Sequence, residues 1–208
     1  MDKAKIRLSP KEAGLVSNAD WILTKNSILQ KVKYLLEHLQ ADQQEIMNNY
    51  SPALPAEVIK VSPKISKGEN YRGLPYLVLD HPRYFEKDDH FAIRSMFWWG
   101  NFFSITLHLS GIYKNKYEQI LCECFDDLQR ENYSICSNAD KWEHHFEAGN
   151  YASLQEMNRE IFSHTIRQKD FLKLAKTYPL QEWDNAGNEM LASFDRLLKW
   201  LVRQRPSG

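Results

Sequence analysis

The chain has few cysteines, no excess charge of either sign and no long apolar run. Its three cysteines, Cys122, Cys124 and Cys136, are an odd number, so they form no disulfide framework and indicate reduced thiols in a cytoplasmic protein. Lys plus Arg and Asp plus Glu number 27 each, and proteins that grip nucleic acid usually show a basic excess. We therefore expect no nucleic-acid partner.

The sequence also shows no pattern of a membrane-spanning helix or of a signal peptide. No stretch approaches the roughly 20 apolar residues of a membrane-spanning helix. The first residues are charged and are not followed by the apolar run of a signal peptide. The sequence thus predicts no membrane partner.

Familiar motifs of catalysis and cofactor binding are absent as well. The eight glycines form neither a phosphate-binding loop nor a nucleophile elbow, and no cofactor is expected. Only residues 143–147, Glu-His-His-Phe-Glu, resemble a set of metal ligands. Adjacent histidines on a helix diverge by about 100°, and zinc proteases space theirs four apart, so we expect no metal.

The chain is rich in aromatic residues, with six Trp, ten Tyr and ten Phe. Disordered segments are poor in such residues, so the composition predicts a folded chain. We find no linker, repeat or low-complexity stretch in the 208 residues, and we expect a single globular domain over residues 1–208.

Helices are predicted at both ends of the chain. Ser9 and Glu12 flank Pro10 as a capping box, which predicts a short helix to about residue 17. Apolar residues spaced by three and four predict further helices at about 20–48, 113–130 and 190–202. Residues 131–150 show no clear pattern, and residues 171–180 suit a strand as well as a helix. Both segments therefore remain unassigned.

Strands are predicted in the middle of the chain, at 58–66, 71–80, 90–99 and 102–110, with a loop over 81–89. Helices, then strands, then helices are typical of an α+β fold. We expect an antiparallel β-meander of about four strands, roughly 58–110, packed against the long N-terminal helix and the C-terminal helices.

Gly100-Asn101 suits a two-residue hairpin turn, which would place Trp99 opposite Phe102. In that register Arg94 lies on the apolar face, and the polar residues Ser95, Thr106 and His108 share the other face. They could line a small polar pocket, or they could be ordinary polar residues of a sheet face with cross-strand hydrogen bonds.

A buried Arg94 requires an anion. Asp80, at the end of the preceding predicted strand, is the nearest candidate. The alternative is a bound carboxylate or phosphate, because the planar guanidinium suits both.

Two functions from different classes remain open. The first is a non-catalytic interaction or assembly protein, homodimeric through the aromatic hairpin and the long helix. The second is a binding protein or enzyme for a small anionic ligand, with a pocket between sheet and helices. For that pocket we predict eight ligand-binding residues: Arg94, His108, Ser95, Thr106, Trp99, Arg72, Tyr76 and Asp80. The sequence does not decide whether the protein is an enzyme.

Overall fold

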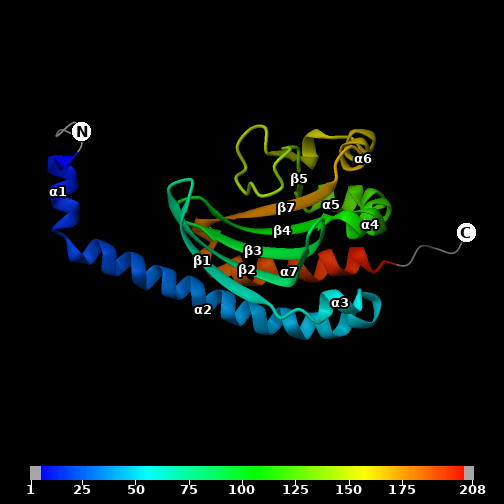
Figure 1. The fold of residues 1–208 in the computed structure, drawn as a ribbon, viewed down its shortest axis with the longest axis horizontal. Helices are drawn as coiled ribbons and strands as arrows, with labels where there is room; N and C mark the ends of the chain where they lie inside the picture. The colour runs from blue at the N-terminus through cyan, green and yellow to red at the C-terminus, as the bar shows by residue number, and fades with distance from the viewer. Residues whose placement is uncertain (1–5, 204–208) are drawn as a thin grey trace, which may run out of the picture.

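The computed structural model describes residues 6–203 and shows an α+β fold. A seven-stranded antiparallel sheet lies against a long N-terminal helix and a C-terminal helix (Figure 1). The strand order is β1-β2-β3-β4-β7-β5-β6. The helices are α1 (Pro10–Val16), α2 (Ala19–Tyr50), α3 (Ala56–Ile59), α4 (Gly111–Glu123), α5 (Phe125–Arg130), α6 (Arg159–Arg167) and α7 (Trp183–Leu201). The strands are β1 (Lys64–Tyr71), β2 (Leu74–Glu86), β3 (Asp89–Trp98), β4 (Phe102–Ser110), β5 (Ser134–Cys136), β6 (Tyr151–Ser153) and β7 (Phe171–Pro179).

The predicted long helix and both terminal helices are confirmed. Helix α1 begins at a complete capping box, in which the amide of Glu12 donates to the Ser9 hydroxyl and the amide of Ser9 donates to the Glu12 carboxylate. The predicted helix at 113–130 is two helices, because the chain breaks its helical conformation at Cys124 between α4 and α5.

The prediction of about four strands was wrong, because β5 and β7 arise from the two regions left unassigned and β6 directly follows the first of them. β7 adds to the free edge of β4 and extends the meander on that side. Residues 56–59, partly predicted as strand, form the single turn α3 after Pro55, which buries Val58. Residues 81–89 are not a loop, since β2 runs on to Glu86 after an irregularity between Asp80 and Arg83.

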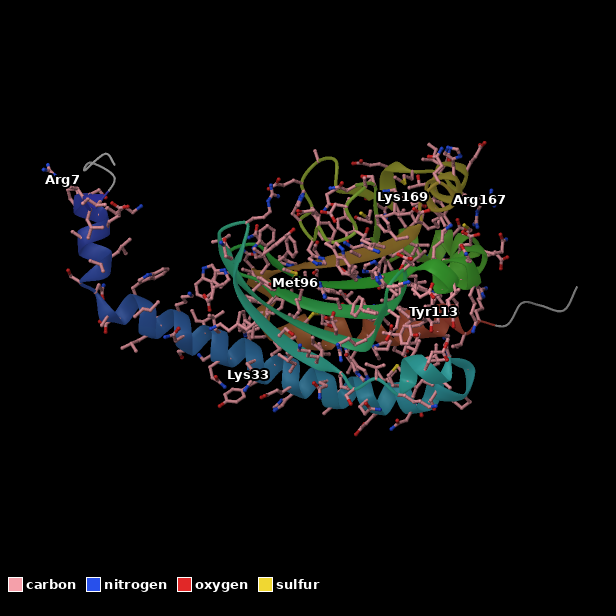
Figure 2. All side chains as sticks on the ribbon, in the orientation of Figure 1. Arg7, Lys33, Met96, Tyr113, Arg167 and Lys169 are labelled. Atoms are coloured by element: carbon pink, nitrogen blue, oxygen red, sulfur yellow. The ribbon has the colours of Figure 1, made fainter. Side chains whose placement is uncertain are left out.

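The two faces of the sheet are covered differently. Helices α2 and α7 lie on one face, and the segment between β5 and β6, residues 137–150, lies on the other (Figure 1). We call these the helix face and the loop face. The helix face carries most of the core; its strand residues include Leu77, Leu79, Phe91, Ile93, Phe97, Phe103, Ile105, Leu107, Leu109, Leu172 and Leu174. Met96, labelled in Figure 2, belongs to a smaller apolar group with Val78 and Trp98.

Among the helices of residues 6–203, none combines the length and the apolar character needed to cross a bilayer.

Candidate functional site

The turn between β3 and β4 has three residues rather than the two predicted. Trp98 pairs with Phe102, and Trp99, Gly100 and Asn101 form the bend, with Gly100 at a φ of 72°. A shift of one residue exchanges the faces of β4 relative to β3. The observed register is the one that buries both apolar patterns together, since Phe97 then lies beside Phe103 on the helix face. The predicted register was wrong because it was inferred from the turn residues Gly100-Asn101 and not from the match between the apolar faces of the two strands.

The corrected register changes which residues meet. Arg94 pairs with Thr106, and Ala92 pairs with His108, all on the loop face. Ser95 points to the helix face instead, where the Gln43 amide donates to its hydroxyl at 3.3 Å. The loop face therefore gathers the charged and titratable groups of these strands.

Arg94 and Asp80 form the predicted ion pair, which is confirmed. The guanidinium donates from Nε to Oδ1 at 2.7 Å and from Nη2 to Oδ2 at 2.9 Å. Burial acts to lower the pKa of Arg94, but the hydrogen bonds and charge of Asp80 outweigh it and leave that pKa above its ordinary value. The bidentate contact uses both carboxylate oxygens of Asp80.

The third nitrogen of the guanidinium, Nη1, lies 2.8 Å from Nε2 of His144, which comes from the segment covering the loop face. A guanidinium only donates, so Nε2 of His144 is the accepting, unprotonated nitrogen and the imidazole is neutral. Burial lowers the pKa of His144 well below its usual range, and the cations Lys173 and Arg94 lower it further.

Lys173 is the second cation of the cluster and lies near the start of β7. It is only 1% exposed, and its Nζ donates to the backbone carbonyl of Glu143 at 2.6 Å. Burial lowers the pKa of Lys173 to about 8, with a further contribution from Arg94. Within residues 6–203, no carboxylate lies at ion-pair distance from its ammonium group. At neutral pH this lysine is a buried cation without a countercharge.

His108 lies beside these groups on β4. Burial lowers its pKa well below the usual value, and the charge of Lys173 adds to the effect. Its Nε2 is buried and has no hydrogen-bond partner among the described residues. A buried ring nitrogen without a partner costs free energy, and such groups commonly have a functional explanation.

These side chains enclose a cavity of about 10 Å³, lined by Asp80, Phe85, Ala92, Arg94, Thr106, His108, His144 and Lys173. A space of this size holds about one water molecule. Beside it lies an open cleft of about 970 Å³, formed by the ends of the sheet, residues 137–142 and the C-terminal end of α6; Lys169, labelled in Figure 2, lines it.

Two aromatic rings form the boundary between the cleft and the cavity. Trp142 and Phe171 both line the cleft, and their ring centres lie 5.5 and 6.3 Å from that of His108. Trp142 is 48% exposed, so it is the less firmly packed of the two.

The covering segment is held to the sheet by the turn between β1 and β2. The Tyr71 hydroxyl donates to Oε2 of Glu143 at 2.8 Å and accepts from the amides of His144 and His145 at 2.7 and 3.0 Å. Arg72 pairs with Glu147 at 2.8 Å on the surface. These contacts fix residues 143–147 of the segment, directly after Trp142.

The structure brings together four of the eight predicted ligand residues: Asp80, Arg94, Thr106 and His108 all line the cavity. The other four lie elsewhere: Ser95 faces the helices, Trp99 packs on Phe97 in the turn, Arg72 pairs with Glu147 and Tyr76 packs on Tyr71.

Sequence reasoning missed Lys173 and His144. Lys173 lies between Leu172 and Leu174 in a segment left unassigned, and a lysine inside a short apolar strand is the signal that could have found it. His144 was considered only as a metal ligand. Residues 6–203 contain no group of three or more His, Cys, Asp or Glu side chains placed to hold a metal ion.

The cluster has a simple charge balance. Asp80 neutralises Arg94, both histidines are neutral, and Lys173 leaves one net positive charge in a buried space. Such a space favours an anionic group, and the neutral tautomer of His108 that carries its proton on Nε2 can donate a hydrogen bond to that group.

No family model, no curated protein and no solved structure matches this chain.

Proposed function

We propose that the protein binds a small molecule carrying a carboxylate or phosphate group, with that group seated against Lys173 and His108. The observation that carries this proposal is the buried ammonium of Lys173, which meets a backbone carbonyl but no carboxylate in the described chain. Burying an ion without a counterion is costly, and a bound anion would remove much of that cost. Arg94 cannot serve as the main anion site, since Asp80 already occupies it.

The space available assigns the two parts of the ligand to different places. The cavity of about 10 Å³ holds about one water molecule and must widen to admit a carboxylate or phosphate, whereas the cleft of about 970 Å³ is of a size that commonly holds small molecules. We place the body of the ligand in the cleft. Its anionic group extends from the cleft toward Lys173, past the rings of Trp142 and Phe171 that lie beside His108.

Hydrogen bonding supports the same arrangement. Thr106 supplies a hydroxyl donor on the cavity wall, and the ammonium of Lys173 has two further N–H groups beyond the one given to Glu143. An anion near Lys173 would also stabilise the charged lysine and raise its pKa from about 8 toward its ordinary value.

A thermal-shift titration tests the proposal with acetate, succinate, phosphate and sulfate at pH 7, and with chloride at matched ionic strength. At a concentration 100 times its Kd, at least one of these anions should raise the Tm by roughly 5 to 10 °C. Lys173→Met keeps the side-chain length, removes the charge and should abolish the rise. Lys60→Met, at an exposed position, should keep it.

Two outcomes would refute the proposal. One is that no anion of the panel stabilises the protein beyond the effect of chloride. The other is a Lys173→Met variant that responds to the stabilising anion as the parent protein does. The expected homodimer and cytoplasmic location stay predictions, since neither depends on the geometry of the buried cluster.

A further inference from the structure

The N-terminal part of the chain projects from the rest of the molecule. Helix α1 and the first turns of α2, residues 6–24, form this arm, and no other element lies alongside it (Figure 1). Figure 2 shows Arg7 at its far end, and Lys33 where α2 has already reached the sheet. Helix α1 has no buried residue, and α2 has none before Leu29.

Apolar side chains are concentrated on this arm. Among residues 6–203, eleven large hydrophobic residues are exposed, and seven of them belong to the arm: Ile6, Leu8, Leu15, Val16, Trp21, Ile22 and Leu23. Single exposed apolar residues are ordinary on protein surfaces, but such a concentration is typical of an interaction site.

The arm continues the apolar stripe of α2. Ile22, Leu29 and Leu36 are seven residues apart and so share one face of the helix. Leu29 and Leu36 are buried against the rest of the molecule, whereas Ile22 is 45% exposed. Lys25 marks the edge of the globular part, since its ammonium pairs with Glu69 of β1 at 2.8 Å. Beyond that point the helix keeps its apolar face but has nothing to pack against.

We infer that the arm is a dimer interface, in which the arms of two copies of this chain pack against each other about a two-fold axis. The exposed apolar surface has the right extent. These seven residues are 44–82% exposed and leave on the order of several hundred Å² of apolar surface on each arm. A standard stable interface buries about 800 Å² from each partner.

The charges of the arm favour a second copy over an anionic partner. Residues 6–24 carry Arg7 and Lys11 against Glu12 and Asp20, so the arm has no net charge. Binding to an anionic membrane or to nucleic acid would call for a basic excess. A two-fold axis between Ile22 and Leu23 in an antiparallel pair of α2 helices would set Asp20 of each copy opposite Lys25 of the other.

The aromatic hairpin, in contrast, does not offer the interface that the sequence suggested. Phe97, Trp98 and Phe103 are buried within the chain itself, at 4% exposure or less. Trp183 of α7 packs on one side of the hairpin, and Phe146 of the covering segment packs on the other. The rings that looked available from the sequence are therefore already covered.

Sedimentation equilibrium of the full chain between about 1 and 100 µM tests the inference. The parent protein should approach twice the chain mass of 24.5 kDa. The double variant Trp21→Glu with Ile22→Glu should weaken dimerisation at least 100-fold and sediment as a monomer. Because the arm adds nothing to the core, its Tm at low protein concentration should equal that of the parent. Ile161→Glu, at a residue 49% exposed outside the arm, should remain dimeric.

A cysteine cross-link tests the geometry. The native cysteines are buried, so Leu23→Cys introduces an accessible thiol next to the expected two-fold axis. Mild oxidation should give a disulfide-linked dimer on a non-reducing gel, and Ile161→Cys should not. A parent protein that stays monomeric at 100 µM would overturn the inference, as would a dimer that survives both glutamates.

Discussion

Both faces of the sheet are largely buried, but they differ in chemistry. On the helix face, β2, β3, β4 and β7 present leucine, isoleucine and phenylalanine to α2 and α7. On the loop face the same four strands present Asp80, Arg94, His108 and Lys173 to residues 137–150. Since successive residues of a strand point to opposite faces, both surfaces are encoded in alternate positions of the same segments.

This difference separates stability from function. Burial of apolar side chains stabilises the fold by roughly 25 cal/mol per Å². A buried ion pair contributes little net stability, and a buried cation without a countercharge opposes folding. The helix face therefore holds the fold together, whereas the loop face carries groups whose presence is best explained by the ligand that we propose.

The largest loss of stability should come from removing a buried side chain on the helix face. Phe103 is fully buried and packs against Phe97 and Trp183, so Phe103→Ala should lower the free energy of unfolding by about 4 kcal/mol. Its neighbour Phe102 is half-buried on the loop face, and Phe102→Ala should cost about half as much. Urea denaturation of both variants measures the contrast. Equal losses would show that the two faces pack alike.

The next effect comes from breaking the ion pair on the loop face. Asp80→Asn leaves the guanidinium of Arg94 largely buried without its countercharge and should cost about 3 kcal/mol. Replacing both partners by apolar residues, as in Asp80→Leu with Arg94→Met, should cost less than this single change. If denaturation shows instead that the double variant is the less stable, the pair itself contributes more to stability than we expect.

A smaller, pH-dependent effect is expected from Lys173. Its pKa is about 8 in the folded protein and 10.5 when unperturbed. Below pH 8 the ammonium is charged in both states and its burial destabilises the fold in full. As the pH rises from 8 to 10.5, the folded protein loses this proton before the unfolded chain does, so the destabilisation disappears. The stability of the parent relative to Lys173→Met should therefore rise by roughly 2 to 3 kcal/mol over this range.

Chemical denaturation at several pH values between 7 and 10.5 measures that difference. The same comparison with Lys60→Met should be flat, because this lysine is exposed. A flat curve for Lys173→Met as well would mean that the buried ammonium carries no penalty at neutral pH.

Much of the fold follows from local patterns in the sequence. The capping box at Ser9 and the spacing of apolar residues by three and four in α2 and α7 predict these helices, because each pattern acts within a few turns of one element. The strands β3 and β4 were predicted almost residue for residue, since each is long and bounded by turn residues.

The candidate site was predicted only in part. Arg94 and Asp80 were paired correctly, because a buried arginine needs an anion and Asp80 stands at the end of the preceding predicted strand. Thr106 and His108 were placed on the wrong face relative to Arg94, since a turn of two or three residues reverses that relation. His144 and Lys173 come from segments 50 and 79 residues beyond Arg94, and no local pattern connects them to it.

By itself, the sequence determined the class of the fold, the long helix and the pairing of Arg94 with Asp80, since these depend on periodicity and on the cost of a buried charge. Tertiary structure alone decided the seven strands, the register of the hairpin and the meeting of Lys173, His108 and His144 under one segment. It also decided that the start of α2 extends past the sheet with its apolar side chains exposed. The physical reason is that contacts between distant segments depend on how whole faces fit together, and the side chains of one element do not specify that fit.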